Sequence, residues 1–387
     1  MSMATSFSAS DHQFMQQAIA LAELGRYTTA PNPNVGCVIV KDNQVIGEGF
    51  HRQAGGPHAE VFALRQAGAT AVGATAYVTL EPCSHFGRTP PCADALIAAG
   101  LSRVVIAMQD PNPRVAGTGA ARLRAAGIQV DVGLLASQAE ALNPGFLHKM
   151  RTQQPYVRLK LACSTDGKVA LANGQSQWLT GEAAREDVQL FRAQSCAILS
   201  TAETVKADKA LLNVRSEAVT RLENGAVRHP LRVILDRRCR LTGHEPLFQQ
   251  GGDILLCHAG PSEEWSALAA VPQHVSCQVT RLRLGLDAVG QLDLSELLVM
   301  LGRRQINMLW VEAGSTLATS FWQQQLIDEL VLYQAPLLLG ADALPLLKAG
   351  GLSQLSQAPR WQWQDVRQIG ADLRLTAYLK PATAPKL

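Results

Sequence analysis

Hydrophobic and polar positions along the first part of the chain switch between a helical period and a strand period. Helices are expected at 11–25, 58–67, 93–99 and 118–126. Strands are expected at 35–40, 44–50, 76–80, 104–108 and 128–134. Asp11 is expected to cap the first helix and Gly25 to end it. The alternation predicts an α/β unit of about 140 residues.

A second alternating pattern follows a stretch at 143–155 that contains two prolines and several basic or polar residues. We therefore expect a domain boundary in this stretch, with domains at 1–148 and 153–387. The second domain is expected to have a helix at 182–195 and strands at 156–162, 197–200, 231–235, 253–257, 308–312, 330–333 and 373–379. Two α/β domains suit a chain of 387 residues.

Composition narrows the classes of function. Hydrophobic residues make up 47% of the chain and the net charge is only +3, so a protein that mainly grips nucleic acid is not expected. No apolar run is long enough to predict a membrane span, and the first residues lack the features of a secretory signal. Most of the eight cysteines lie in apolar runs and are interpreted as buried thiols. This usage predicts a cytoplasmic, reducing location.

The strongest chemical signal is a set of one histidine and two cysteines. His58, Cys83 and Cys92 follow one another in the order His-Ala-Glu, Pro-Cys and Pro-Cys. Water is a poor nucleophile at neutral pH, and a zinc ion with three protein ligands lowers the pKa of a bound water to about 7. Glu60 lies two residues after His58, where it can move protons without binding the metal. The pattern predicts a zinc deaminase of a nucleobase-like amine.

The spacing of the two cysteines departs from the usual zinc deaminase signature. Eight residues separate Cys83 from Cys92, whereas the signature has two. A loop of this length can still close on one ion, and Pro91 suits the start of a helix whose N–H groups stabilise a thiolate. Two alternatives stay open: a closed structural site with His85 as a fourth ligand, and a set of residues that binds no metal.

Several longer motifs resemble one enzyme family. They are Pro31-Asn-Pro-Asn-Val-Gly36, Pro57-His-Ala-Glu60, the stretch from Thr79 to Cys92, Gln109-Asp-Pro-Asn-Pro113, the stretch from Leu159 to Gly167, Ser176-Gln-Trp178 and Trp310-Val-Glu-Ala-Gly314. Together they make nearly the whole chain similar to the bifunctional deaminase–reductase of riboflavin biosynthesis. The long cysteine loop is specific to that family, which accounts for the unusual spacing.

The resemblance implies two reactions and two folds. A cytidine-deaminase-like three-layer domain would deaminate 2,5-diamino-6-(5-phosphoribosylamino)pyrimidin-4-one with Zn²⁺. A dihydrofolate-reductase-like α/β domain would then reduce the ribosyl side chain to ribityl with NADPH. The resemblance implies that Asn32, His51 and Arg88 hold the deaminase substrate. Arg88 also suits a phosphate on physical grounds, whereas Asn32 could be a turn residue and His51 a surface histidine.

The resemblance also implies the residues of the reductase site. The substrate would contact Ser176, Arg192, Asp208, Leu212, Arg215 and Glu312. The cofactor would contact Ala162, Trp178, Thr204, Asp208, Gly314, Ser315 and Thr316. The turn at 312–317 is also a phosphate-binding candidate in its own right, because a strand ends there and a helix begins. The sequence contains no Rossmann glycine motif at such a turn, and Gly117-Thr-Gly119 is interpreted as the start of a helix.

Lys160 lies mid-strand between apolar residues, so it is either a snorkelling edge residue or a group aimed into a site. Hydride transfer to carbon needs a proton donor, and Lys160, Asp208 and Glu312 are the candidates.

Two positions depart from the family pattern. The family usually has Asp-Asp-Pro where this chain has Asp208-Lys209-Ala210, and commonly has Ser where this chain has Arg237. Both departures bear on the reductase pocket.

Two other functions remain open at this point. One is a zinc deaminase of an RNA base with an accessory binding domain, which predicts a basic stripe with interleaved aromatic residues. Aromatic content is only 5%, and the basic residues are dispersed. The other is a zinc-stabilised binding protein without activity. The main interpretation takes small phosphorylated pyrimidines as the partners, with no nucleic acid and no membrane, and expects a homo-oligomer.

Overall fold

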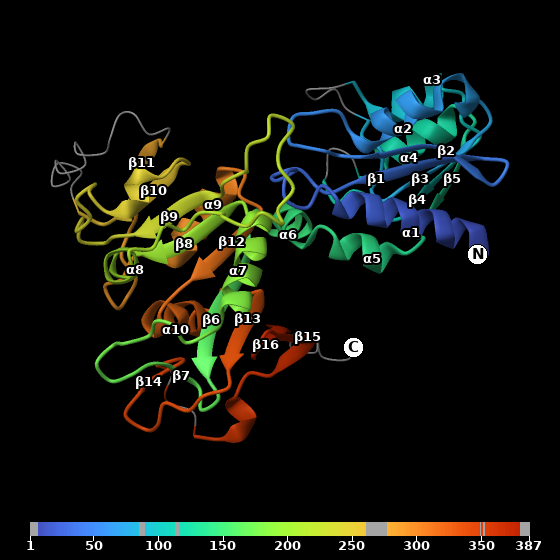
Figure 1. Ribbon diagram of the computed structural model, residues 1–387. Coiled ribbons are helices and arrows are strands. Elements are labelled where there is room, and N and C mark those ends of the chain that lie inside the picture. Colours follow the sequence, from blue (N-terminus) through green and yellow to red (C-terminus); the bar gives the residue numbers. More distant parts are fainter. Residues whose placement is uncertain are drawn as a thin grey trace. The chain divides into compact units, whose positions relative to one another are not determined.

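The computed structural model describes residues 7–84, 90–112, 116–260, 277–348, 350 and 353–379. It contains two compact units (Figure 1). The first unit comprises 1–153 together with 219–228, and the second comprises 154–218 and 229–387. The sequence-based division at one boundary near residue 150 did not include 219–228 in the first unit.

The first unit has a five-stranded sheet in the order β2-β1-β3-β4-β5. Its strands are β1 (Gly36–Lys41), β2 (Gln44–Phe50), β3 (Thr75–Val78), β4 (Arg103–Ile106) and β5 (Gln129–Val132). β1 is antiparallel to both β2 and β3, whereas β3, β4 and β5 run parallel. The carboxyl ends of β3 and β4 therefore lie at the same edge of the sheet.

Helices cover both faces of this sheet (Figure 1). One face packs against α2 (Ala59–Ala67), α3 (Cys92–Ala98) and α4 (Thr118–Ala125) through small residues such as Ala63 and Ala93. The other face packs against α1 (Ala9–Glu23), α5 (Ala136–Ala141) and α6 (Pro144–Thr152) through residues such as Met15 and Leu147. Alternate residues of each strand face opposite layers, which gives the three-layer arrangement that was expected.

Two helix details differ from the sequence-based expectations. α1 begins at Ala9 with Ser8 as its cap, and Asp11 completes a capping box by accepting a hydrogen bond from the Ser8 N–H. Asp11 is therefore the third helical residue and not the cap, and the helix ends at Glu23 with Leu24 as its C-cap. The expected boundary stretch contains α6, because Pro144 stands in the first helical turn, where a missing N–H costs nothing.

The second unit has a nine-stranded sheet in the order β11-β10-β9-β8-β12-β6-β13-β16-β15. Its parallel strands are β6 (Tyr156–Ser164), β8 (Ala197–Thr201), β9 (Leu231–Leu235), β10 (Ile254–His258), β11 (Val279–Arg283), β12 (Met308–Glu312) and β13 (Glu329–Ala335). β16 (Asp372–Leu379) and β15 (Trp361–Ile369) add an antiparallel edge. A two-stranded sheet joins β7 (Lys168–Ala170) to β14 (Leu344–Pro345).

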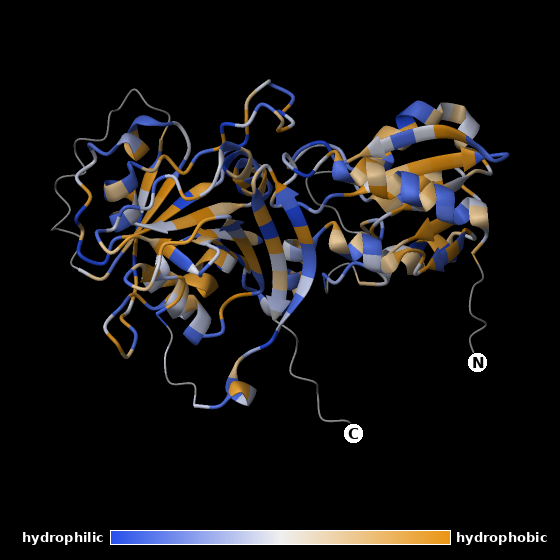
Figure 2. Cartoon of the chain, turned by 60° about the horizontal axis from the view of Figure 1, so that its bottom comes forward, coloured by the Kyte–Doolittle hydropathy of each residue, from blue (hydrophilic) through white to orange (hydrophobic). Residues whose placement is uncertain are grey.

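The helices of the second unit are α7 (Glu182–Gln194), α8 (Ala202–Asp208), α9 (Leu294–Arg303) and α10 (Ser315–Gln323). α7 and α8 pack on one face of the sheet through residues such as Val188 and Val205. Strand residues of the opposite face, such as Leu199 and Leu309, are buried as well. Figure 2 shows the resulting hydrophobic strands inside both units and more hydrophilic positions outside. The chain is thus an α/β protein in which each unit has hydrophobic clusters of its own.

Candidate functional site

The histidine and the two cysteines come together in the first unit. His58 is the N-cap of α2, Cys83 lies in the loop after β3, and Cys92 is the first residue of α3. The His58 Nδ1 atom lies 3.2 Å from the Cys92 Sγ atom and 3.6 Å from the Cys83 Sγ atom. Typical Zn–N and Zn–S bond lengths place such atoms about 3.6 Å apart in a tetrahedral site. The three side chains therefore fit one zinc ion.

Local interactions favour a thiolate at this cluster. The Cys92 backbone N–H donates a hydrogen bond to the Cys83 sulfur over 3.3 Å, at the start of α3. Hydrogen bonding from the Cys92 side chain lowers the pKa of the Cys83 thiol, and hydrogen bonding to His58 acts in the same direction; the contact with Cys83 in turn raises the pKa of Cys92, so Cys83 is the thiol that ionises first. Zinc binds the thiolate form of cysteine, so this donor set suits the metal chemically as well as geometrically.

Glu60 stands beside the cluster without belonging to it. It is the second residue of α2 and is only 3% exposed. Its Oε2 atom is buried and has no hydrogen-bond partner within the described ranges. Burial raises the pKa of the Glu60 carboxyl. A buried carboxyl group with a free oxygen next to three metal donors is suited to transfer protons.

Within the described residues, no fourth histidine, cysteine or carboxylate joins His58, Cys83 and Cys92. The alternative fourth ligand, His85, lies outside the described residues, and so does Arg88. The expected phosphate contact of Arg88 therefore stays a prediction.

Asn32 and His51 lie together near the cluster. The Asn32 amide nitrogen is 3.0 Å from His51 Nε2, and His51 Nδ1 is 3.0 Å from the Pro57 carbonyl oxygen. A carbonyl only accepts, so Nδ1 carries the proton and Nε2 accepts from Asn32. The His51 and His58 rings meet edge to face with centroids 5.6 Å apart. The structure thus brings Asn32 and His51 to the metal donors, and His51 is a buried residue and not a surface one.

Glu81 is a supporting residue that the sequence analysis missed. Its buried carboxylate accepts hydrogen bonds from the backbone N–H groups of Asp110, Gly117 and Ala120. It thereby ties the loop that contains Cys83 to the start of α4, whose N-cap is Gly117. A carboxylate directly before the Pro-Cys pair was the available signal, because a buried acid needs several donors.

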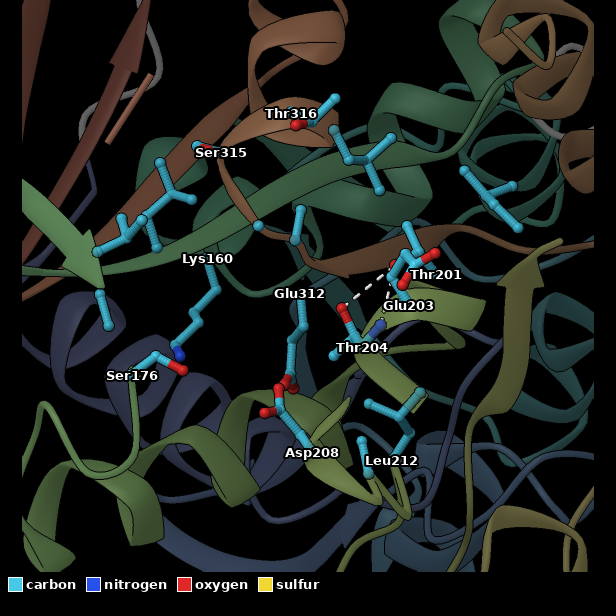
Figure 3. A pocket seen from close by; sticks show the side chains of 18 of the residues that line it. Lys160, Ser176, Thr201, Glu203, Thr204, Asp208, Leu212, Glu312, Ser315 and Thr316 are labelled. Carbon is cyan, nitrogen blue, oxygen red and sulfur yellow. Dashed lines mark hydrogen bonds between the residues drawn. The ribbon is translucent and has the colours of Figure 1, made fainter. Parts of the chain in front are cut away.

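The second candidate site is a cavity of about 1140 Å³ in the second unit. It exceeds the ~300–1,000 Å³ that is typical of small-molecule sites, which leaves room for a cofactor and a substrate together. Figure 3 shows Lys160, Glu312 and Asp208 directed into it. The cavity lies at the carboxyl ends of β8, β9 and β12, where parallel sheets commonly bind ligands.

Arg192, which is buried, and Glu312, which is partly buried, form an ion pair in this cavity. Arg192 donates to both carboxylate oxygens over 2.5 and 2.8 Å, and the Trp310 indole donates to one of them over 2.8 Å. Burial alone would raise the pKa of Glu312, but the Arg192 guanidinium outweighs it and lowers that pKa to about 2. Burial lowers the pKa of the nearby Lys160 ammonium group. Glu312 is therefore ionised at neutral pH, and Lys160 gives up its proton more easily than an ordinary lysine.

The other expected substrate residues line the same cavity. Asp208 is exposed at the end of α8 and accepts a hydrogen bond from Gln177 over 2.9 Å. Arg215 bonds the Asn213 side chain over 2.9 Å, and Leu212 is buried with a positive φ of 50°. Ser176 completes the group that the structure brings together at this cavity.

All seven expected cofactor residues also line the cavity: Ala162, Trp178, Thr204, Asp208, Gly314, Ser315 and Thr316. Trp178 is 70% exposed and lies under the Arg185 guanidinium. Gly314 is the N-cap of α10, and a side-chain carbon added there would meet no atom within 4 Å. This helix start faces open space and can accept a phosphate.

Lys348 was not anticipated. Its Nζ donates to the Thr316 hydroxyl over 3.0 Å beside the start of α10. This ammonium group adds positive charge where the helix start already favours an anion, so the residues at this end of the cavity fit the phosphates of a nicotinamide dinucleotide.

The two departures from the family pattern also lie at this cavity. Lys209 caps the end of α8 with a positive φ of 49°, and Ala210 packs against the core of the second unit. Arg237 follows β9 and donates to the Gly290 carbonyl. All three residues line the cavity, so the substitutions alter its wall directly.

Comparison with known proteins identifies the family. The model of the cytidine and deoxycytidylate deaminase zinc-binding region matches residues 8–108, and the model of the RibD C-terminal domain matches residues 155–375. The chain is 50% identical over 372 residues to the riboflavin biosynthesis protein RibD of Escherichia coli (strain K12). The matched residues make up 94% of this chain and 98% of the E. coli protein. The chain belongs to the RibD family.

Solved structures agree with this assignment. A RibD structure from Acinetobacter baumannii superimposes with a TM-score of 0.86 at 46% identity and covers 96% of this chain and 99% of that one. A deaminase/reductase structure from Thermotoga maritima gives a TM-score of 0.81 at 32% identity, with 96% and 99% covered. The Haemophilus influenzae RibD is 49% identical, with coverage of 96% and 98%. These relatives span both units of the chain.

Membership in the RibD family confirms the main interpretation of the sequence. The chain is a bifunctional enzyme of riboflavin biosynthesis, with a cytidine-deaminase-like hydrolase domain followed by a dihydrofolate-reductase-like oxidoreductase domain. Its cofactors are Zn²⁺ and NADPH, and small phosphorylated pyrimidines fit its activity. No helix among the described residues is both long and apolar enough to cross a bilayer.

Proposed function

We propose that residues 1–148 deaminate 2,5-diamino-6-(5-phosphoribosylamino)pyrimidin-4-one and that residues 153–387 then reduce its ribosyl side chain. The observation that carries the first half is the position of Glu60, a buried carboxyl group with an unpartnered oxygen beside His58, Cys83 and Cys92. Zinc bound by these three residues supplies an activated water. Every other part of the reaction is assigned to side chains of the chain itself.

Glu60 is proposed as the proton carrier of the deaminase. It takes a proton from the attacking water and delivers it to the ring nitrogen; it then takes the remaining proton from the newly added hydroxyl group and delivers it to the amino group, which leaves as ammonia. Its burial keeps bulk water away from the carboxyl group, so the proton stays within the site.

Asn32, His51 and Arg88 are proposed to hold the substrate of this reaction. The neutral His51 ring and the Asn32 amide are already linked by a hydrogen bond. They offer a fixed polar surface for the pyrimidine, and pre-positioned groups of this kind reduce the entropy lost on binding. Arg88 would pair with the phosphate.

In the reductase, Arg192 and Arg215 are proposed to attract the substrate phosphate, while Glu312 holds Arg192 in place through the bidentate pair. NADPH supplies the hydride. Lys160 is proposed as the proton donor, because its half-buried side chain lines the cavity, its ammonium group is directed into the cavity (Figure 3), and desolvation lowers the pKa of that group. Glu312 is unsuited to that role, because its pKa of about 2 keeps it ionised.

Zinc removal tests the two-site assignment. After treatment with a chelator, ammonia release should fall to background, whereas NADPH oxidation with the deaminated intermediate should persist. Circular dichroism serves as the control for unfolding. Loss of both activities in a folded protein would contradict the separation of the two sites.

We also propose that the enzyme works as a homo-oligomer in the cytoplasm. The edge strand β15 exposes Trp363 and Val366, each 56% accessible, and exposed apolar edge strands tend to pair. None of the eight cysteines forms a disulfide, which suits a reducing compartment. Light scattering tests the assembly: Trp363→Glu should lower the measured mass, and a monomeric unmodified protein would refute this proposal.

A further inference from the structure

The segment 219–228 comes from the reductase half of the sequence but belongs to the first unit. It forms a compact loop of its own. The Leu222 N–H donates to the Ala226 carbonyl over 2.9 Å, and the Gly225 N–H donates to the Leu222 carbonyl over 2.8 Å. The Asn224 side chain accepts from the Ala226 N–H over 3.0 Å. These bonds fix the direction in which the segment presents its polar groups.

Long-range hydrogen bonds join this segment to the rest of the first unit. The Glu223 backbone N–H donates to the Gln53 side-chain oxygen over 3.2 Å. The Arg228 Nε donates to the Tyr27 carbonyl oxygen over 3.1 Å. One bond therefore reaches the loop after β2, and the other reaches the loop after α1.

These two loops carry Asn32 and His51, the proposed substrate-holding residues. The loops also contact each other, since the Thr28 hydroxyl donates to the Arg52 carbonyl and the Ala54 N–H donates to the Thr28 carbonyl over 3.4 Å. Tyr27 directly precedes Thr28, and Gln53 lies two residues after His51. The segment thus bonds to both loops within a few residues of the Asn32–His51 pair.

The zinc donors and Glu60 are held differently. His58 and Glu60 are fixed by α2, and Cys92 is fixed by α3. Neither hydrogen bond from 219–228 reaches these elements. Loss of the segment's contacts should therefore affect the binding of the substrate more than the chemical step.

We propose that Arg228 and the loop 219–228 position Asn32 and His51 for the deaminase substrate, so that sequence from the reductase half helps to build the deaminase site. Arg228 is a positioning residue in this proposal and does not touch the substrate. The inference rests on the proposed role of Asn32 and His51.

The test uses the full-length, zinc-loaded enzyme with the variants Arg228→Ala and Gln53→Ala. Each should raise the KM of deamination about tenfold and change kcat by less than about twofold, because small displacements of binding groups weaken binding. Zinc content and NADPH oxidation with the deaminated intermediate should stay unchanged. Arg228→Lys keeps a donor and should restore part of the lost affinity.

Arg221→Ala is the matched control. Arg221 donates to the Gly225 carbonyl within the same loop, so its removal should leave the KM of deamination unchanged. In a background of His51→Ala, Arg228→Ala should add little further change, because both act through the same residue.

The outcomes separate this inference from the function on which it rests. If Asn32→Ala and His51→Ala raise the KM but Arg228→Ala and Gln53→Ala do not, the positioning role is wrong and the proposed substrate site stands. If Asn32→Ala and His51→Ala leave the KM unchanged, the proposed substrate site itself is wrong. An equal fall of kcat in both reactions of Arg228→Ala would indicate general destabilisation and would overturn the positioning role.

Discussion

Glu60 is buried and Glu312 is partly buried, one in each unit, and the surroundings of these two glutamates differ sharply. Glu60 has an oxygen with no hydrogen-bond partner, and burial raises its pKa. Glu312 accepts two hydrogen bonds from Arg192 and one from Trp310, and its pKa falls to about 2. The same side chain is therefore available to exchange a proton in one site and is an anion at neutral pH in the other. Environment, and not residue type, assigns the role.

The largest expected effect is on the kcat of deamination, when the Glu60 carboxyl group is replaced. Glu60→Gln keeps the shape but cannot carry a proton, so kcat of deamination should fall by about 10²–10⁴-fold. Ammonia release measures this loss, and NADPH oxidation with the deaminated intermediate is the internal control. Retention of full deaminase activity would show that another group moves the proton.

Removing the partner of the second glutamate should mainly cost stability. Arg192→Ala leaves the partly buried Glu312 carboxylate without its guanidinium, and because water reaches part of this carboxylate the cost should not exceed the ~3–5 kcal/mol of a fully buried pair. Urea unfolding followed by tryptophan fluorescence would measure it, because all six tryptophans of the chain belong to the second unit. The double variant Arg192→Met/Glu312→Gln should recover part of the loss, and a lack of recovery would argue against an uncompensated charge as the cause.

The pH dependence of stability sharpens the same contrast. Folding lowers the pKa of Glu312 from 4.5 to about 2, so the contribution of Glu312 to the free energy of unfolding is fully present above about pH 5. It is lost as the pH falls from about 4.5 to 2, and amounts to about 3 kcal/mol. Urea unfolding across this range should show a shallower acid slope in Glu312→Gln. Identical slopes in the two proteins would contradict the assigned pKa.

The smallest expected effect concerns the support of the metal loop. A side-chain carbon at Gly119 would come within 2.0 Å of the Pro82 carbonyl oxygen, so Gly119→Ala must displace the loop that leads to Cys83. We expect a loss of about 1–3 kcal/mol in the first unit and weaker zinc retention. Thermal unfolding and zinc analysis after dialysis check this. Gly127→Ala is a poor control because its φ is positive, whereas Ala121→Ser on the same helix is suitable.

The metal cluster could be predicted from sequence because its ligands belong to short motifs, two of which stand at the starts of helices. His58 caps α2 and Cys92 begins α3, so local structure alone turns both side chains toward one point. The reductase residues were placed through the resemblance, since Lys160, Arg192 and Glu312 come from distant segments that no local pattern connects. Their meeting depends on the strand order, which places β12 next to β6.

Other features escaped prediction for physical reasons. α6 was interpreted as a linker because proline usually breaks helices, yet Pro144 occupies a position where it is tolerated. β15 was not expected, because most of its residues are polar or exposed and give no alternating signal. The return of 219–228 to the first unit involves long-range hydrogen bonds, such as those from Glu223 to Gln53 and from Arg228 to Tyr27, and hydrophobic periodicity carries no information about such contacts.

The strand order of the second unit has a consequence for biosynthesis. β6 is the first strand of that sheet to leave the ribosome, but its neighbours are β12 and β13, which lie close to the end of the chain. At 5–20 residues per second, β6 waits roughly 10–30 seconds for its partners. During that time its apolar side chains stay uncovered on the nascent polypeptide. We therefore expect this enzyme to depend on chaperones during translation more strongly than a protein whose central strands pair in order of synthesis.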